Sequence, residues 1–465
     1  MSNRVIPIVP ESTSPLDTVC DLKWNYPIFN LARGEFRSCC RTPSKRVDAD
    51  RLKENGIEEF LNSKEMIQSR LDLMQGIKHE DCVSCWKLEE RGMASPRHSP
   101  EQFYIQLQRK YVDSNTPYTP ERLLEYLSTV NEDSEVLRSY HPYMLEISLG
   151  NTCDMKCMYC NHHYSTQWGT ERIKYGEITQ EQYDNEFPKA PEGFEEKFWE
   201  WFDKHGRKFS NRIGVIGGEP LIMPEFYSML DRLLDGISKV SDVRKSKATL
   251  WIVTNMNTPP QYLEKFFKYL PKITEVCNLE ILVSMESVGP RAEYIRNGVN
   301  WDRFVSNIDK LLSKKDLNFD FGFIMSQNAL SIASIKEFIQ FTESLYFKYN
   351  RPVALKHNIV SFPSWQNPMI LTPDFADYID DCIEYMKCNV DMMPEVNDYF
   401  GRYDQYIVFL EELSKSIKNN QGDYTEDRKK FVPWFKVFDE RRNLNLLETF
   451  PEYRNFYKMC EQLNG

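Results

Sequence analysis

The sequence of 465 residues contains no apolar run that approaches the roughly 18 residues needed to span a bilayer. Its first residues, MSNRVIPIVPESTSP, lack the basic stretch followed by an apolar one that is typical of secretory signals and transit peptides. Positive charge is also scarce, because 58 Lys and Arg face 69 Asp and Glu and leave a net charge of -11 at pH 7. This balance argues against an extended electrostatic contact with nucleic acid. We therefore expect a soluble, cytoplasmic protein without membrane or nucleic-acid partners.

Without a signal peptide, the twelve cysteines are better explained by metal ligation or catalysis than by a disulfide framework. Seven of them fall into two groups, one near the N-terminus and one in the middle of the chain. The other five are isolated, and we expect each to be a small buried apolar side chain. These five are Cys20, Cys277, Cys382, Cys388 and Cys460. Cys20 is the least certain of them, because it lies near the first group.

From about Pro142 the sequence alternates short, strand-like apolar runs with amphipathic helical stretches. The predicted strands are 143–149, 212–217, 249–255, 279–285, 318–325 and 354–362. Six β-then-α units in series predict an α/β fold with a parallel sheet and right-handed crossovers, either open or curled into a partial barrel. Ligand chemistry is then expected at the carboxyl ends of the strands.

The flanking regions differ in character. The stretch NYPIFNLARGEFRSCC predicts two short strands joined by a turn at Arg33-Gly34, and a helix-like stretch leads from there to CVSCW. Helical patterns dominate after about residue 366. We predict four parts: a cysteine-rich α+β module at 1–105, a connecting segment at 106–141, the α/β part at 142–365 and a helical C-terminal region at 366–465.

The middle cysteine group lies in LGNTCDMKCMYCNHHYST, directly after the first predicted strand. Cys153, Cys157 and Cys160 thus occupy a loop at the carboxyl edge of the sheet. Three thiolates cannot complete a structural zinc site, which needs four protein ligands, but they can hold three irons of a 4Fe-4S cluster and leave one iron open. The alternative is a zinc site that borrows a distant fourth ligand such as His162 or His163, to which we otherwise assign no catalytic role.

The spacing Cys153-x3-Cys157-x2-Cys160, with Tyr159 before the last cysteine, resembles the signature of radical S-adenosylmethionine (radical SAM) enzymes. The resemblance implies a partial, TIM-like (β/α)6 barrel. It also implies that the open iron binds the amino and carboxylate groups of S-adenosylmethionine. In that family, one-electron reduction cleaves this cosubstrate to methionine and a 5'-deoxyadenosyl radical, which abstracts hydrogen from a substrate. Such an enzyme needs an electron donor, for example flavodoxin or ferredoxin.

The second predicted strand ends in Gly217-Gly218-Glu219-Pro220, which resembles the GGEP motif of the same family. There, backbone groups and the acidic side chain hold the amino group of the cosubstrate. Paired glycines let the backbone approach a ligand closely, which a side chain would prevent. Read alone, the same four residues are an ordinary strand-ending turn.

The ends of later strands carry further candidates for the cosubstrate pocket. Ser284 and Glu286 are two residues apart, so both face one side of the strand, where the family often binds the ribose. Arg296 matches an arginine that pairs with the cosubstrate carboxylate, and its alternative is a solvated surface arginine. Asn255 and Asn328 are candidates for the adenine and ribose pocket, or else simple turn residues.

The first cysteine group consists of Cys39, Cys40, Cys82 and Cys85, for which zinc and a second iron-sulfur cluster are both acceptable. The segments NLARGEFRSCC and CVSCWKLEERGMASPR resemble the auxiliary-cluster modules called SPASM and twitch, and one group of four fits the twitch form. In this chain the group precedes the barrel, whereas those modules usually follow it. Successive side chains diverge, so Cys39 or Cys40 can be a bystander, with Cys20 or a non-protein ligand completing the site.

These features predict a radical SAM enzyme that modifies a peptide or a small molecule. An auxiliary cluster suits an oxidative outcome, because it can accept the second electron from the substrate radical. One alternative is an epimerase or nucleotide-modifying enzyme in which the second metal site is structural. Another is a non-catalytic metal-binding interaction protein.

Overall fold

The computed structural model describes residues 14–90, 95, 97, 119–139, 142–206, 212–241, 248–392, 401–419 and 422–464. Residues 106–118, 140 and 141 of the predicted connecting segment lie outside the described residues, as do residues 1–13, for which we predict no targeting signal. The chain divides into two compact units. The first comprises residues 1–150, 187–215 and 235–248, and the second comprises 151–186, 216–234 and 249–465.

The sheet of the first unit begins with the predicted hairpin. Strands β1 and β2 are antiparallel, β3 pairs with the other edge of β2, and β4 runs parallel to β1. Gly34 in the hairpin turn has φ +61°, and a Cβ there would lie 2.4 Å from Cδ of Pro191, so the turn needs a glycine. In sheet order the strands are β3 (Lys45–Arg46), β2 (Glu35–Arg37), β1 (Ile28–Asn30), β4 (Met144–Ser148) and β5 (Arg212–Ile216), whose last residue belongs to the second unit.

Short helices make up most of the rest of the first unit, and several of them share an apolar core in which Trp24, Leu73 and Leu137 are buried. Arg70 is also buried, and its guanidinium donates to the carbonyl oxygens of Lys23 and Leu137. The helices are α1 (Pro15–Thr18), α2 (Leu22–Asn25), α3 (Ala49–Asn55), α4 (Glu58–Leu61), α5 (Lys64–Met74), η1 (Glu80–Cys82), α6 (Val83–Glu89), α8 (Pro120–Leu127), η2 (Glu135–Leu137), α11 (Phe194–Trp201) and the π-helical turn η3 (Phe202–Gly206).

The second unit contains four parallel strands joined by helices, as the sequence predicts. The interior residues of β7 are buried as a continuous run, which is the pattern of a strand covered on both faces. The strands are β6 (Thr249–Thr254), β7 (Asn278–Ser284), β8 (Asp320–Gln327) and β9 (Val353–Ile359). Each lies within three residues of its predicted ends. The connecting helices are α14 (Pro260–Val276), α15 (Gly289–Ile295), α16 (Trp301–Leu312) and α17 (Ile335–Tyr349).

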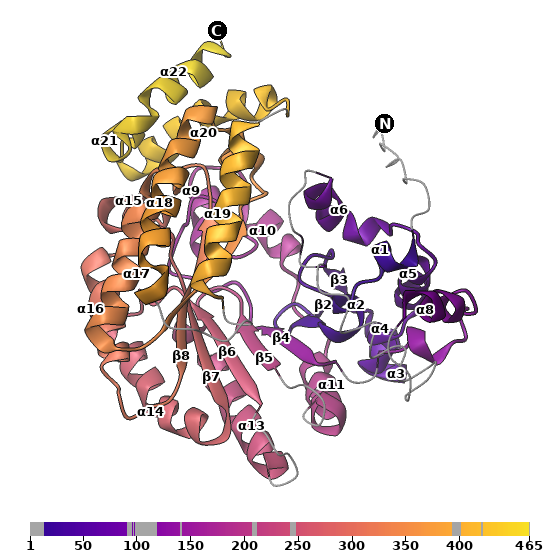
Figure 1. The fold of residues 1–465 in the computed structure, drawn as a ribbon. Coiled ribbons are helices and arrows are strands. Elements are labelled where there is room, and N and C mark those ends of the chain that lie inside the picture. The colour runs from indigo at the N-terminus through magenta and orange to yellow at the C-terminus, as the bar shows by residue number, and fades with distance from the viewer. Residues whose placement is uncertain are drawn as a thin grey trace. The chain divides into compact units, whose positions relative to one another are not determined.

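The C-terminal region is helical, again as predicted. Helix α18 packs against α17 and α19, and the three lie side by side in Figure 1. The C-terminal helices are α18 (Ala376–Asn389), α19 (Tyr403–Lys418), α20 (Thr425–Arg442), α21 (Leu446–Thr449) and α22 (Arg454–Gln462). The unit also contains α9 (Thr166–Lys174), α10 (Gln180–Glu186), the start of α13 (Pro224–Ser241), and the short turns η4 (Pro220–Ile222), η5 (Ile332–Ser334), η6 (Ser364–Gln366), η7 (Pro368–Ile370), η8 (Pro373–Phe375), η9 (Val390–Met392) and η10 (Pro451–Tyr453).

The fold is therefore α/β, with parallel strands, connecting helices and a helical C-terminal part, which confirms the predicted class. Among the described residues, no helix combines the length and the apolar character that crossing a membrane requires.

The substitution Ile281→Ala tests the core of the parallel sheet. Ile281 lies in the middle of β7 with its side chain fully buried, so we expect a loss of about 2–5 kcal/mol in the free energy of unfolding. Val408→Ala is the control, because Val408 is 54% exposed on α19 and its replacement should change the free energy by less than about 0.5 kcal/mol. Guanidinium denaturation measures both, and equal effects would contradict the assignment of Ile281 to the core.

Candidate active site

The cysteine loop, residues 151–165, follows β4 along the chain and is held by backbone hydrogen bonds rather than by helix or strand. The amide of Lys156 donates to the carbonyl of Asn297 at 2.7 Å, and that of Met158 donates to Ile295 at 2.8 Å. Both acceptors lie at the end of α15 or just after it. An irregular loop lacks the regular backbone hydrogen bonds of a helix or strand. These bonds to neighbouring segments therefore satisfy its backbone polar groups and fix its path.

Two side chains outside the loop reinforce it. The indole Nε1 of Trp168 on α9 donates to the carbonyl of Cys157 at 3.0 Å. The amide Nε2 of Gln366, which follows β9, donates to the carbonyl of Met158 at 3.0 Å. Sequence analysis missed both residues. The aromatic stretch FPSWQ after the last predicted strand is the one signal that points to Gln366.

The three thiols of the loop are all partly exposed, so a ligand can reach them. Burial raises the pKa of Cys157 to about 11 and that of Cys160 to about 12, and it raises the pKa of Cys153 as well. The free thiols are therefore protonated at neutral pH, and a metal would displace these protons on binding. Nη1 of Arg296 lies 4.0 Å from Sγ of Cys157 and favours its thiolate form.

Within the described part of the chain, His162, His163 and Glu186 are the three potential metal ligands whose ligand atoms all lie within 4.8 Å of one another, and both histidines belong to the cysteine loop. Sulfurs around one tetrahedral zinc lie about 3.8 Å apart, given Zn–S bonds of about 2.3 Å. The three thiols of the loop are not gathered that closely in this structure.

His162 and His163, considered above as possible zinc ligands, face a different partner. Nε2 of His162 lies 2.5 Å from Oε2 of Glu186, and Nε2 of His163 lies 3.8 Å from the same atom. The guanidinium of Arg172 lies 2.8 Å from Nδ1 of His162, which places a positive charge beside the imidazole. The geometry thus groups the histidines with Glu186 and Arg172.

The Gly-Gly-Glu-Pro segment after β5 packs directly against the cysteine loop. Gly217 and Gly218 have φ values of +96° and +50°, which favour glycine. A Cβ on Gly218 would lie 2.1 Å from the carbonyl oxygen of Thr152, and that oxygen accepts a hydrogen bond from the amide of Glu219 at 2.8 Å. The glycine pair therefore lets this backbone meet the loop just before Cys153.

Glu219 itself is fully buried and faces the end of β6. Its carboxylate accepts from the hydroxyl of Thr254 at 2.7 Å and from the amide of Asn255 at 2.6 Å. Burial raises its pKa to about 7, although these donors act in the opposite direction. In this structure its side chain thus connects two strand ends, whereas the sequence resemblance assigns it to the amino group of the cosubstrate.

Asn255 and Asn328 both use their side chains in turns. Asn255 donates to Oδ1 of Asp154 at 2.9 Å and accepts from the amide of Asn257 at 2.8 Å. Asn328 accepts from the amides of Leu330 and Ser331 and donates to the carbonyl of Ser326. The bonds to Asn257, Leu330 and Ser331 are those of turn residues, and a place for either asparagine in the cosubstrate pocket stays a prediction. The Asp154–Asn255 contact, which joins the cysteine loop to β6, was not predicted.

Arg296 is buried and paired, so it is not a solvated surface arginine. Its Nη2 lies 2.6 Å from Oε2 of Glu286, which is buried as well. The hydroxyl of Tyr159 donates to the same carboxylate at 3.2 Å. The structure thus brings three of the predicted site residues together beside Cys157. Ser284, the last residue of β7, is partly exposed two residues before Glu286.

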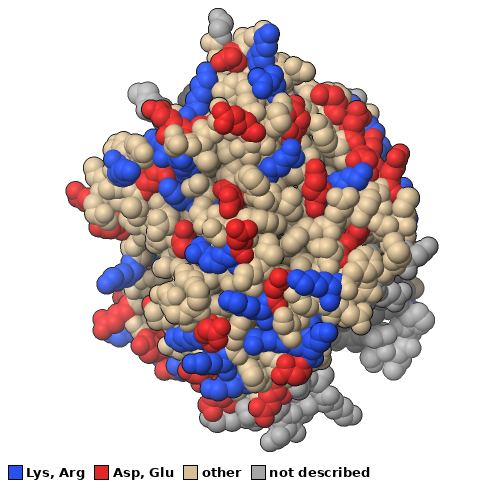
Figure 2. All heavy atoms as spheres, turned by 90° about the vertical axis from the view of Figure 1, so that its left-hand side faces the viewer, with Lys and Arg blue, Asp and Glu red and all other residues tan. Residues whose placement is uncertain are grey.

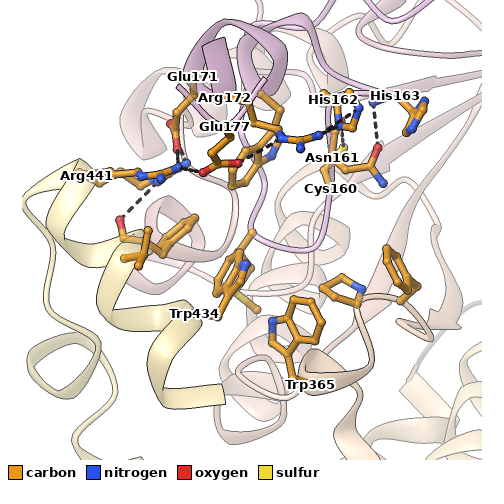
Figure 3. A pocket seen from close by; sticks show the side chains of 17 residues that line it. Cys160, Asn161, His162, His163, Glu171, Arg172, Glu177, Trp365, Trp434 and Arg441 are labelled. Atoms are coloured by element: carbon orange, nitrogen blue, oxygen red, sulfur yellow. Dashed lines mark hydrogen bonds and ion pairs between the residues drawn. The ribbon is translucent and has the colours of Figure 1, made fainter. Parts of the chain in front are cut away.

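A cavity of about 570 Å³ borders the loop at Cys160. Its walls come from the cysteine loop, from α9, from the segment after β9 and from α20 (Figure 3). The sequence gives no signal that α20, more than 260 residues after the cysteine loop, takes part. At one end of the cavity, Glu171 of α9 pairs with Lys156 at 2.7 Å and with Arg442 of α20 at 2.9 Å.

The first unit gathers the other cysteine group and adds Cys20 to it. Cys20, Cys39, Cys82 and Cys85 are 4–7% exposed, whereas Cys40 is partly exposed. Burial raises the pKa of Cys20, and the nearby Cys39 and Cys82 raise it further. Cys20 is thus a small buried side chain, as expected. It is not isolated in space, however, because Cys39 and Cys82 lie near it.

Two tethers hold these cysteine segments together. Arg97 donates to the carbonyl of Thr18 at 2.9 Å, pairs with Glu89 at 2.9 Å and lies 3.8 Å above the ring of Trp86. This arginine therefore fixes the Cys20 segment to the helix that carries Cys85. The hydroxyl of Ser84 on the same helix donates to the carbonyl of Arg41 at 3.4 Å, which ties the Cys39-Cys40 turn to it.

Residues 147–341 match a family model described as the radical SAM superfamily. The chain contains a radical SAM domain. The matched residues include the cysteine triplet, the Gly-Gly-Glu-Pro segment, Glu286 and Arg296. The family of this domain implies a 4Fe-4S cluster and S-adenosylmethionine.

A search of curated proteins finds no match to this chain. Among solved structures, two similar ones are Streptococcus suis SuiB bound to S-adenosylmethionine and SuiB bound to precursor peptide SuiA. The first is 13% identical with a TM-score of 0.36, and the alignment covers 70% of this chain and 63% of that one. The second is 12% identical with a TM-score of 0.36, over 77% and 68%. The chain thus spans less than two thirds of the first structure's length.

The radical SAM domain requires that Gly218 stay a glycine. Gly218→Ala adds a methyl group in contact with the Thr152 carbonyl, so we expect a loss of about 3 kcal/mol or more in stability, together with reduced iron binding. Gly193→Ala is a matched control, because Gly193 is left-handed with φ +79° and ψ 0° and has open space around its Cβ position, and backbone strain alone should cost about 1–2 kcal/mol. Thermal unfolding and iron analysis compare the two, and equal losses would contradict the close approach at Gly218.

Proposed function

We propose that the chain binds a 4Fe-4S cluster through Cys153, Cys157 and Cys160 and uses S-adenosylmethionine to abstract hydrogen from a peptide or small-molecule substrate. The single observation that carries the proposal is the anchored loop, which presents three partly exposed thiols inside the radical SAM domain. When bound, the reduced cluster supplies the electron that cleaves S-adenosylmethionine to methionine and a 5'-deoxyadenosyl radical.

The residues around the loop prepare the site for this chemistry. The guanidinium of Arg296 stabilises the thiolate of Cys157, while Glu286 balances that guanidinium and Tyr159 donates to Glu286. A buried ion pair with additional hydrogen bonds keeps a fixed geometry, because separating the two partners would leave buried charges unpaired and raise the free energy. We propose that this network holds the cosubstrate beside the cluster, together with Ser284 and the glycines of the Gly-Gly-Glu-Pro segment.

We propose a second iron-sulfur cluster in the twitch-like module at residues 1–105. The support is the gathering of buried thiols in the first unit. Cys39 is buried whereas Cys40 is partly exposed, so we propose that Cys40 is the bystander and that Cys20, rather than a non-protein ligand, completes the site. Such a cluster suits an oxidative modification, since it can accept an electron from the substrate radical.

One face of the protein carries charges of both signs. On the face shown in Figure 2, Lys and Arg side chains are interspersed with Asp and Glu. An extended basic surface, which nucleic-acid binding requires, is not visible on that face. We propose a cytoplasmic electron donor such as flavodoxin or ferredoxin as the partner.

Replacing any one of Cys153, Cys157 and Cys160 by Ser should abolish 5'-deoxyadenosine formation, because a hydroxyl is a poor substitute for an iron-bound thiolate. Cys277→Ser is the control, since Cys277 is a buried, isolated cysteine at the end of α14 and its loss should leave iron content and cleavage close to those of the unmodified protein. The measurement is chromatography of S-adenosylmethionine products after anaerobic reconstitution and reduction. Cleavage that survives in all three variants would refute the proposed function.

The ligands of the second site can be identified by iron analysis. We expect Cys20→Ser, Cys82→Ser and Cys85→Ser each to lose roughly half of the bound iron, because two clusters of similar size are then reduced to one. Cys40→Ser should retain all of it, as should the control Cys388→Ser, since Cys388 is exposed on α18. Full iron in Cys20→Ser together with a loss in Cys40→Ser would reverse the assignment of the fourth ligand. Zinc in place of iron would contradict the cluster.

A further inference from the structure

Helix α20 lies after the residues that the family model matches, yet it contacts segments that anchor the cysteine loop. Three of these segments are α9, which supplies Trp168, the chain around the end of α15, which supplies the carbonyls of Ile295 and Asn297, and η6, which supplies Gln366. Side chains of α20 bind each of the three in turn. The proposed function as stated above gives α20 no part in the site.

Arg442, the last residue of α20, reaches two of these segments at once. Its Nη2 lies 2.9 Å from Oε2 of Glu171 on α9, and its Nε donates to Oδ1 of Asn297 at 3.2 Å. Its guanidinium carbon lies 4.9 Å from the centre of the Trp168 ring. The arginine side chain is 3% exposed and the glutamate side chain 5%. Separating such a buried pair is costly, so the pair holds both segments in fixed positions.

The same three partners bind the cysteine loop. Glu171 pairs with Nζ of Lys156 at 2.7 Å, and the carbonyl of Asn297 accepts from the amide of that lysine. The indole of Trp168 donates to the carbonyl of the next residue, Cys157. One arginine of α20 therefore contacts three residues that fix the position of a proposed iron ligand.

Other side chains of α20 extend this attachment. Asp439 accepts from the hydroxyl of Tyr294 in α15 at 2.6 Å. Near the start of the helix, Asp427 accepts from the hydroxyl of Ser364 at 2.6 Å, and Ser364 belongs to the same short turn as Gln366. The two ends of α20 thus bind different segments that anchor the loop.

The neighbouring Arg441 does not replace Arg442. Its Nη1 lies 2.6 Å from Glu177 but 3.7 Å from Oε1 of Glu171, and that oxygen accepts no hydrogen bond among the described residues. In Figure 3, Glu171 extends from α9 towards α20. Arg442 is therefore the α20 residue that hydrogen-bonds Glu171.

We propose that Arg442 is a positioning residue for the cluster. Through Glu171, Asn297 and Trp168 it holds Lys156 and Cys157 in the geometry that the iron-bound loop requires. The inference deepens the proposed function and rests on it, because it gives the C-terminal helix control over the cluster site.

The test is hydrogen–deuterium exchange of the full-length protein, read by mass spectrometry from peptides of the cysteine loop before and after anaerobic reconstitution. Arg442→Gln removes the charge and the bond to Glu171. We expect the loop to exchange about 10-fold faster than in the unmodified protein, because opening the loop no longer breaks a charged hydrogen bond. Peptides of β7 in the same samples serve as an internal reference.

Two further variants separate positioning from general stability. Arg428→Gln is the matched control, because Arg428 is also on α20 but donates to the carbonyl of Ile370, which is not part of a segment described above as an anchor. Its loop exchange should stay within about 2-fold of the unmodified protein, even where its melting temperature falls. Arg442→Lys should give an intermediate rate, because an ammonium keeps the charge beside Glu171 but not the planar set of donors that also reaches Asn297.

The reconstituted protein gives a second measurement. The Arg442→Gln variant should release iron to a chelator about 3- to 10-fold faster than the unmodified protein, because a loop that opens more often exposes its thiolates. Where this variant fails to fold, Asn297→Ala removes one contact of Arg442 and keeps the carbonyl that accepts from Lys156. Its loop should exchange about 3-fold faster.

Unchanged loop exchange in the folded variants would overturn the inference. An equal rise in Arg428→Gln, or in the β7 peptides, would overturn it as well, because it would show a general loosening of the fold. Exchange before reconstitution does not depend on the cluster or on turnover. Faster loop exchange in a protein that never cleaves S-adenosylmethionine would therefore refute the proposed function and leave the effect of Arg442 on the loop intact.

Discussion

The geometry of the candidate active site depends on the hydrogen bonds that hold the cysteine loop in place. The Thr152 carbonyl accepts from Glu219, whose carboxylate is bound in turn at the end of β6, and the amides of Lys156 and Met158 donate to the chain around the end of α15. The loop is thereby attached to segments that follow β5, β6 and β7. A loop attached to several strand ends keeps its three thiols in one geometry without regular structure of its own, which a cluster with one open iron requires.

Buried charge is the second constraint on this site. Glu286 and Arg296 form an ion pair with little exposure, and Glu171 pairs with Lys156 and Arg442. Such pairs contribute little net stability, since desolvation offsets their attraction, but separating them is costly. They therefore fix the positions of neighbouring groups. The first pair sets the electrostatic environment of Cys157, and the second connects α9 and α20 at the cavity beside Cys160.

Much of this arrangement could be predicted from the sequence, because it depends on local patterns. Short β-branched runs predict the strands, and the spacing of Cys153, Cys157 and Cys160 indicates the same radical SAM domain that the family model matches. The contacts of Gln366 and Arg442 could not be predicted, because they join segments far apart in the chain. Asn255 and Asn328 show the same limit, because an asparagine at the end of a strand can either shape a turn or bind a ligand, and the sequence alone does not distinguish these two roles. Cys20 lies near the other thiols because Arg97 holds its segment in place. Its isolated position in the sequence did not reveal this proximity.

The most direct test of the central claim is electron paramagnetic resonance of the reduced, anaerobically reconstituted protein before and after addition of S-adenosylmethionine. The account holds that one iron at the loop has no protein thiolate, so the cosubstrate should bind that iron and change the cluster signal. A signal from the loop cluster that stays the same when S-adenosylmethionine is added, or a loop that holds zinc and gives no signal, would contradict it.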